Sequence, residues 1–119
     1  MLDEKNGFSA LKLNLGHYGG GIVDKNELWM NKITDLILAY ENVYTDFACQ
    51  CFEKKDYSPL LKYIKKYSKS KLEDRILFGS DFMINLFYID SYENYLKHFF
   101  KFGYKRKFCN ENPYRFLFG

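Results

Sequence analysis

Apolar and polar positions along the chain predict strands and helices in alternation. Leu11 to Leu15 alternate between apolar and polar side chains, which predicts a strand, and a glycine-rich turn from Gly16 to Gly21 follows. The next stretch places apolar side chains at helical spacing on one face. That predicted face consists of Trp29, Ile33, Leu36, Ile37 and Tyr40.

The same pattern returns in a second unit. Residues 42–48 are rich in β-branched and aromatic side chains and predict a strand. Ser58 and Pro59 predict a helix start, with serine as the N-cap and proline at the first helical position. The apolar face of this helix is predicted to be Leu60, Leu61, Ile64 and Tyr67.

A third unit begins with the strand predicted from Arg75 to Asp81. Its helix ends at Gly103, a residue suited to the left-handed conformation that often terminates helices. Residues 112–117 form a further predicted helical turn, in which Asn112 is the cap and Pro113 follows it. The apolar face of the third helix is predicted to be Tyr92, Tyr95, Leu96, Phe99 and Phe100.

The predicted strands start near residues 10, 42 and 75, which is a spacing typical of strand–helix–strand units. Alternating strands and helices favour parallel strands with right-handed crossovers. Residues 1–119 show no linker or low-complexity stretch. We therefore expect a single α/β domain built from three consecutive βα units.

Composition narrows the classes of partner. The formal charge is only +3 and the basic residues are scattered among acids, which argues against nucleic acid. Lys101, Lys105, Arg106 and Lys107 form a basic cluster, which is interpreted as a solvated helix end in preference to a phosphate-binding patch. No apolar run is long enough for a membrane span, and Met1 to Lys5 lack a signal core. Three cysteines without framework spacing predict a reducing, cytoplasmic location.

Two side chains stand where parallel α/β folds collect their functional groups, at the carboxyl ends of strands. His17 follows the first predicted strand and Asp81 ends the third. Imidazole and carboxylate groups bind divalent metals or transfer protons to and from water. The alternative is structural, with His17 as a hydrogen-bonded turn residue and Asp81 as a helix cap.

Four segments together resemble amidohydrolase-related proteins. Leu13 to Gly20 is similar to the L-x-H-x-G-G ending of that family's sixth strand, and Val43 to Asp46 resembles its seventh. Arg75 to Phe82 is similar to the eighth strand, R-I-L-F-G-S-D-Y/F. Glu111 to Gly119 resembles the closing E-N-x-x-R-x-L-G turn. The resemblance implies strands 6–8 of a (β/α)8 barrel of the TIM type, which would be an incomplete barrel.

The resemblance also implies a metal-dependent hydrolase acting on a small-molecule substrate, with zinc as the usual metal. In that family the eighth-strand aspartate, here Asp81, binds the metal or takes a proton from its bound water. The sixth-strand histidine, here His17, contacts the metal, the water or the substrate. Family reactions include hydrolysis of amides and lactones and, in one branch, non-oxidative decarboxylation.

The chain departs from the family pattern in its ligands. The first-strand His-x-His pair and the fifth-strand histidine have no counterpart, and the second histidine, His98, is expected on a helix surface. Catalytic zinc takes about three protein ligands, and a full barrel takes about 250 residues. Cys49 and Cys51 are considered as further ligands but are more typical of buried small residues. Asp46 is expected to make structural hydrogen bonds.

Three strands cut from a barrel would leave two open edges and an uncovered apolar face. We therefore expect self-association or a complementing chain that supplies the first five strands, whether the gene is truncated, split or encodes a short protein. A non-catalytic remnant used for assembly or binding is the alternative of another class. A flavodoxin-like binding domain is disfavoured because Gly19 to Gly21 lead into Ile22 to Asp24, which is not a phosphate-binding signature.

Overall fold

The centre of the fold is a three-stranded parallel sheet, seen in a computed structural model that describes residues 11–20 and 27–119. The strands are β1 (Leu13–Leu15), β2 (Val43–Asp46) and β3 (Ile76–Leu77), in the order β1-β2-β3. Leu13 pairs with Val43, and Thr45 pairs with Ile76. The predicted parallel α/β arrangement is confirmed, although each strand is shorter than the sequence pattern indicates.

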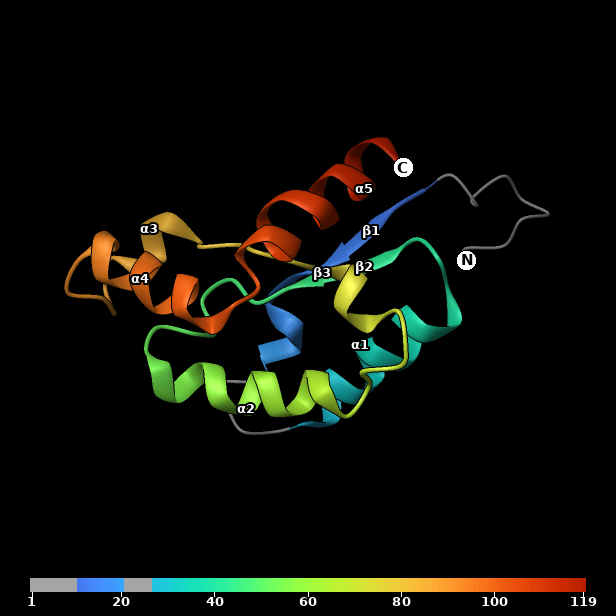
Figure 1. The fold of residues 1–119 in the computed structure, drawn as a ribbon, viewed down its shortest axis with the longest axis horizontal. Coiled ribbons are helices and arrows are strands. Elements are labelled where there is room, and N and C mark those ends of the chain that lie inside the picture. The colour runs from blue at the N-terminus through green and yellow to red at the C-terminus, as the bar shows by residue number, and fades with distance from the viewer. Residues whose placement is uncertain (1–10, 21–26) are drawn as a thin grey trace.

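Helices connect and flank the strands (Figure 1). A 3₁₀ segment (Gly16–Gly20) follows β1, and another (Leu72–Arg75) precedes β3. A wide π turn (Lys107–Glu111) leads into the last helix. The α-helices are α1 (Glu27–Ala39), α2 (Lys54–Lys65), α3 (Phe82–Asn85), α4 (Tyr92–Phe102) and α5 (Asn112–Phe118).

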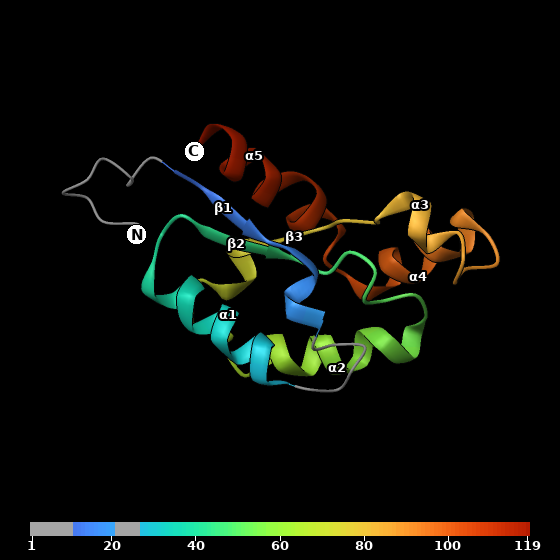
Figure 2. The ribbon, with the colours of Figure 1, turned by 180° about the vertical axis from the view of Figure 1, so that it is seen from behind.

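The sheet lies between two helical layers. In Figures 1 and 2, α1 and α2 cover one face and α5 lies on the other. The main core forms on the α1–α2 side, where Ile37, Leu60 and Ile76 are fully buried. On the opposite face, the ring of Tyr44 packs edge-on against Phe116 of α5, with centroids 5.0 Å apart. The expectation of an uncovered sheet face is therefore wrong around Tyr44, because α5 covers it.

The start of α2 differs from the prediction. The helix begins at Lys54, and Ser58 and Pro59 lie inside it. The Asp56 carboxylate accepts the main-chain N–H groups of Phe52 and Glu53, both at 2.9 Å. This capping arrangement satisfies donors that a helix start otherwise leaves free, so it sets the boundary one turn earlier than the Ser-Pro signal.

The buried face of α1 is rotated from the predicted one. Met30, Ile33, Thr34 and Ile37 are buried, whereas the predicted Trp29, Leu36 and Tyr40 remain 55%, 43% and 42% exposed. The rotation follows from a buried polar chain, in which the Thr34 hydroxyl bonds the Tyr18 hydroxyl at 2.8 Å and the Tyr63 hydroxyl at 3.0 Å. Buried hydroxyls need partners, and this pairing turns Thr34 inward.

The third unit matches its prediction more closely. Ser91 caps α4 by accepting the Asn94 main-chain N–H at 3.1 Å, and Gly103 ends the helix with φ of 94°. Tyr95 and Phe99 are buried as predicted, while Phe100 stays 44% exposed.

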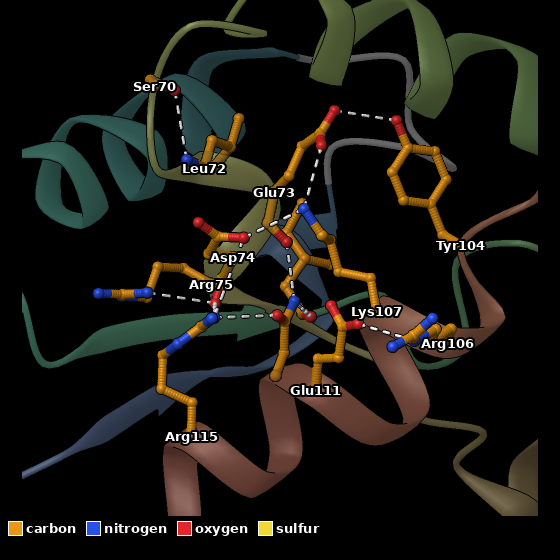
Figure 3. Close-up of polar contacts among 12 residues, drawn as sticks. Ser70, Leu72, Glu73, Asp74, Arg75, Tyr104, Arg106, Lys107, Glu111 and Arg115 are labelled. Carbon is orange, nitrogen blue, oxygen red and sulfur yellow. Dashed lines mark hydrogen bonds and ion pairs between the residues drawn. The ribbon is translucent and has the colours of Figure 1, made fainter. Parts of the chain in front are cut away.

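The closing segment is not a new capped turn. Asn112 lies within a continuous helical stretch, because the π turn runs directly into α5. Its buried side-chain amide donates to the carbonyls of Glu73 at 2.7 Å and Ile76 at 2.6 Å. Figure 3 shows the surrounding polar cluster, in which Arg115 donates to the Asp74 carbonyl and Lys107 pairs with the Asp74 carboxylate.

None of the helices in the described ranges combines the length and the apolar character needed to cross a membrane. The predicted absence of a signal core in Met1 to Lys5 lies outside the described residues, as do Gly21 and the segment from Ile22 to Asp24.

Candidate active site

The carboxyl ends of the three strands bring the two predicted site residues together. His17 stands in the turn after β1, and Asp81 precedes α3, just beyond β3. The imidazole Nε2 of His17 and Oδ2 of Asp81 lie 4.0 Å apart. Both side chains are partly open to solvent, at 49% and 32% exposure. The pair is therefore accessible to a small ligand.

A main-chain carbonyl fixes the protonation pattern of the His17 ring. Nδ1 of His17 lies 2.6 Å from the carbonyl oxygen of Ala48. A carbonyl oxygen only accepts hydrogen bonds, so Nδ1 must carry the proton in this contact. In the neutral ring, Nε2 then holds the free lone pair and faces the Asp81 carboxylate. Two electron-rich groups facing each other in this way are suited to bind a divalent cation between them.

Unusual backbone conformations place these groups. His17, Cys49 and Asp81 have φ values of 60°, 61° and 50°, in the left-handed region that non-glycine residues seldom adopt. Such conformations are held by surrounding structure and tend to cluster at functional sites. Here each of the three residues lies at the carboxyl end of a different strand.

Asp81 does not act as a side-chain cap for α3. Its carboxylate accepts no capping hydrogen bond from that helix, and the Ile84 and Asn85 N–H groups donate to the Asp81 main-chain carbonyl instead. Asp81 therefore stands at the N-cap position of α3, as the structural alternative expects, but its carboxylate makes no capping hydrogen bond and lies 4.0 Å from the His17 ring instead. For His17 the alternative holds in part, since its ring is hydrogen-bonded within the turn region.

Asp46 ties the strand ends together. Its Oδ1 accepts the main-chain N–H groups of His17 and Ala48, both at 3.0 Å, and its Oδ2 accepts the Asn14 side-chain amide at 2.7 Å. The expected structural hydrogen bonds are confirmed. Gly79 allows the end of β3 to approach, because a Cβ there would lie 3.0 Å from the Cβ of Ala48.

Some contributors to this site gave little signal in the sequence. The carbonyl of Ala48 orients the His17 ring, yet main-chain groups carry no residue-type signature. Asn14 lies within the motif around His17 but is neither acid, base nor usual metal ligand. The parallel register pairs Asn14 with Tyr44, so Asp46, two residues further along β2, is its diagonal neighbour on the same sheet face.

The cysteines do not complete a ligand set. Cys51 is 1% exposed, and its thiol points to the Asp56 carbonyl at 3.7 Å. Burial raises the pKa of the Cys49 thiol, and the negative charge of Asp81 raises it further. Zinc binds the thiolate, so both environments oppose ligation. His98 lies on α4 and lines a groove of about 400 Å³ between α2 and α4, whose lining includes neither His17 nor Asp81.

The donor types at the strand ends fit a divalent metal, but the number falls short. An imidazole nitrogen and a carboxylate oxygen are ordinary zinc ligands, and a carbonyl behind the imidazole is a common supporting contact. Within residues 11–20 and 27–119, no group of three or more His, Cys, Asp or Glu side chains is placed to hold a metal ion. The site therefore offers two donors where catalytic zinc takes about three.

The fold and the site define an α/β protein with its polar groups where parallel α/β enzymes carry their active sites. A family model described as amidohydrolase matches residues 7–119, which is nearly the whole chain. The chain therefore belongs to the amidohydrolase family, and this membership indicates a hydrolase. No curated protein and no solved structure matches the chain.

Proposed function

We propose that this chain forms part of a metal-dependent hydrolase that cleaves C–N or C–O bonds of a small-molecule substrate with water. His17 and Asp81 are the proposed active-site residues. One observation carries the proposal: Nε2 of His17 faces Oδ2 of Asp81 at 4.0 Å, while Nδ1 is engaged by the Ala48 carbonyl. Two electron-rich donors are thus directed to one point at the ends of the strands.

The proposed roles follow from the chemistry of these donors. His17 contributes the Nε2 lone pair, and Asp81 contributes a carboxylate that either binds the metal or accepts a proton from the attacking water. A divalent metal, with zinc as the first choice for this donor set, would lower the pKa of water so that hydroxide is available near neutral pH. At least one further donor must come from outside the described residues.

The proposed place of the chain in a barrel rests on strand order. Parallel β1, β2 and β3 lie in sequence order, as consecutive strands of a (β/α)8 barrel do. We assign them to the sixth, seventh and eighth strands, with residues 1–119 as one domain from the C-terminal part of the barrel. The assignment is supported by the motifs around His17 and Asp81.

The proposed partner is a chain, or another segment, that supplies the remaining strands. Apolar side chains around α3 support this proposal, since Met83 is 69% and Phe87 85% exposed. Surfaces of this kind are usually covered in a stable protein, so self-association is the other outcome. The three cysteines are all free, which supports the proposed cytoplasmic location.

A non-catalytic assembly or binding role is the second candidate. The site offers only two donors among the described residues, and two ligands do not hold catalytic zinc, which favours this non-catalytic role. Metal binding at the His17–Asp81 pair separates the two candidates. Decarboxylation at the same metal site would require the same donors and is distinguished only by the product formed.

The test is metal-dependent stabilisation of the purified protein. Excess Zn²⁺ or Co²⁺ should raise the Tm of the wild type slightly, because even weak binding by two donors stabilises the folded state when the metal is in excess. His17→Asn and Asp81→Asn should each abolish the shift, and asparagine tolerates the left-handed backbone at both positions. His98→Asn is the matched control and should retain the shift. Equal shifts in all four proteins would reject the proposed site.

A further inference from the structure

The Asp46 carboxylate links the turn after β1 to the turn after β2. One oxygen, Oδ1, accepts both the His17 N–H and the Ala48 N–H at 3.0 Å. Because a single atom holds both donors, the two main-chain segments are kept at a set separation. At this separation the Ala48 carbonyl reaches Nδ1 of the His17 ring at 2.6 Å.

The remaining carboxylate oxygen is also anchored. Oδ2 of Asp46 accepts the Asn14 side-chain amide at 2.7 Å. Hydrogen bonds to an ionised carboxylate are stronger than those between neutral groups. The orientation of Oδ1 toward the His17 and Ala48 N–H groups is therefore fixed from the β1 side as well.

Two acceptors compete for the single proton of the neutral His17 ring. The Ala48 carbonyl lies 2.6 Å from Nδ1, whereas the Asp81 carboxylate lies 4.0 Å from Nε2, beyond hydrogen-bond distance. The shorter contact decides the tautomer. If the Ala48 carbonyl moved away, Asp81 would be the remaining acceptor and would favour a proton on Nε2, which blocks the lone pair.

We propose that Asp46 is a positioning residue that holds His17 in its Nδ1–H tautomer and so keeps Nε2 free toward Asp81. Asp46 acts through the main chain of His17 and Ala48 and does not itself contact the ligand. The importance of a free Nε2 for hydrolysis rests on the proposed function. The effect of Asp46 on the His17 tautomer can be measured without an assay of enzymatic activity.

The chain has only two histidines, which makes the tautomer directly observable. Two-bond ¹H–¹⁵N correlations of the ¹⁵N-labelled protein, recorded at alkaline pH where imidazoles are neutral, separate the two tautomers. His98, on α4, is the internal reference in the same spectrum. The wild type should show His17 as the Nδ1–H form.

Four variants define the contribution of Asp46. Asp46→Ala removes both acceptor oxygens and so frees the Ala48 segment. If the hydrogen bond from His17 Nδ1 to the Ala48 carbonyl is lost in this way, the His17 tautomer ratio should change at least about fivefold. Asp46→Asn keeps a neutral and weaker acceptor and should change the ratio about twofold in the same direction. Asn14→Ala leaves the Oδ1 contacts and should change it less than Asp46→Ala. Asp35→Ala, on the exposed side of α1, should leave it unchanged.

The proposal is overturned if the wild type shows the Nε2–H form. It is also overturned if folded Asp46→Ala, judged by circular dichroism and an unchanged His98 signal, keeps the wild-type ratio. Should Asp46→Ala not fold, an unchanged ratio in Asp46→Asn overturns it instead. A tautomer change without any metal-dependent rise in Tm would reject the proposed function alone, whereas a metal response with an unchanged ratio would reject only the role of Asp46.

Discussion

The Asn112 side chain donates to the Ile76 carbonyl at 2.6 Å and thereby joins the final helical stretch to the first residue of β3. The same amide nitrogen donates to the Glu73 carbonyl at 2.7 Å. Both carbonyls lie at the end of the sheet opposite to Asp81. The contact therefore fixes the strand that carries Asp81 without taking part in the site.

Replacing Asn112 should destabilise the protein strongly. Asn112→Ala leaves the buried Ile76 carbonyl and the partly buried Glu73 carbonyl without this donor, which should cost about 2 kcal/mol or more of unfolding free energy. Asn112→Asp should cost more, because a carboxylate would face two carbonyl oxygens. Urea unfolding measures both. Asn110→Ala, at an exposed position, is the control and should stay within about 0.5 kcal/mol of the wild type. Equal midpoints for all three variants would contradict this role.

Acid should weaken the structure partly through Glu41. A hydrogen bond from Lys71, aided by the charges of Lys71 and Arg75, lowers the pKa of the Glu41 carboxyl. A pKa that is lower in the folded state gives stability that is present above the unfolded value and is lost as the pH falls through the folded value. The loss of unfolding free energy between about pH 6 and about pH 3 should therefore be larger in the wild type than in Glu41→Gln.

Lys71→Met provides the reciprocal check on this pH dependence. Removing the ammonium removes the largest cause of the lowered Glu41 pKa, so the variant should also lose less stability in acid than the wild type. Chemical unfolding at both pH values gives the comparison. Identical losses in wild type, Glu41→Gln and Lys71→Met would show that Glu41 does not contribute to the acid sensitivity.

The three thiols should differ in reactivity in the native state. Cys109 is exposed and Cys49 half-buried, whereas Cys51 is 1% exposed and burial raises the pKa of its thiol. Because the thiolate is the reactive form, Cys51 should be labelled by iodoacetamide only as fast as the protein unfolds. Mass spectrometry of peptides from timed samples measures each site. Labelling of Cys51 as fast as Cys109 would contradict the burial of Cys51 in the core just before α2.

Sequence patterns predicted that His17 and Asp81 would lie close together, because the relevant rule is topological. The strands around His17 and Asp81 are recognisable by alternation, and parallel strands necessarily place their carboxyl ends at one edge. Asp46 could be placed on a strand for the same reason. Its main-chain partners could not be found, because the N–H groups of His17 and Ala48 carry no residue-type signature and His17 adopts a left-handed conformation that the pattern does not predict.

The predicted start of α2 and the predicted buried face of α1 were wrong, because other contacts outweighed the local sequence signal. Ser58 and Pro59 are a good helix start, but Asp56 caps an earlier one by accepting two main-chain N–H groups. The buried face of α1 was set by Thr34, whose hydroxyl partners come from segments distant in sequence. Choices of this kind depend on tertiary contacts, which periodicity within one helix does not contain.

Gly19 should be the least replaceable glycine near the site. It has φ of 67°, and a Cβ there would lie 2.5 Å from the Cβ of Trp29, so α1 itself would have to move. Gly103 is the matched control, since it also has a positive φ, of 94°, but no atom lies within 4 Å of an added Cβ. Gly103→Ala therefore measures the cost of the backbone conformation alone, expected at about 1 kcal/mol.

Gly19→Ala should cost about 2 kcal/mol more than Gly103→Ala, because the clash with α1 is added to the same conformational strain. Urea unfolding of the two variants gives this difference directly. Since Gly19 lies in the turn that carries His17, Gly19→Ala should also shift the His17 signals in the ¹⁵N spectrum, while Gly103→Ala should leave them in place. Equal losses of unfolding free energy in the two variants would mean that α1 moves to accommodate the added methyl group. The close packing of this turn against Trp29 would then not be what holds His17 at the end of β1.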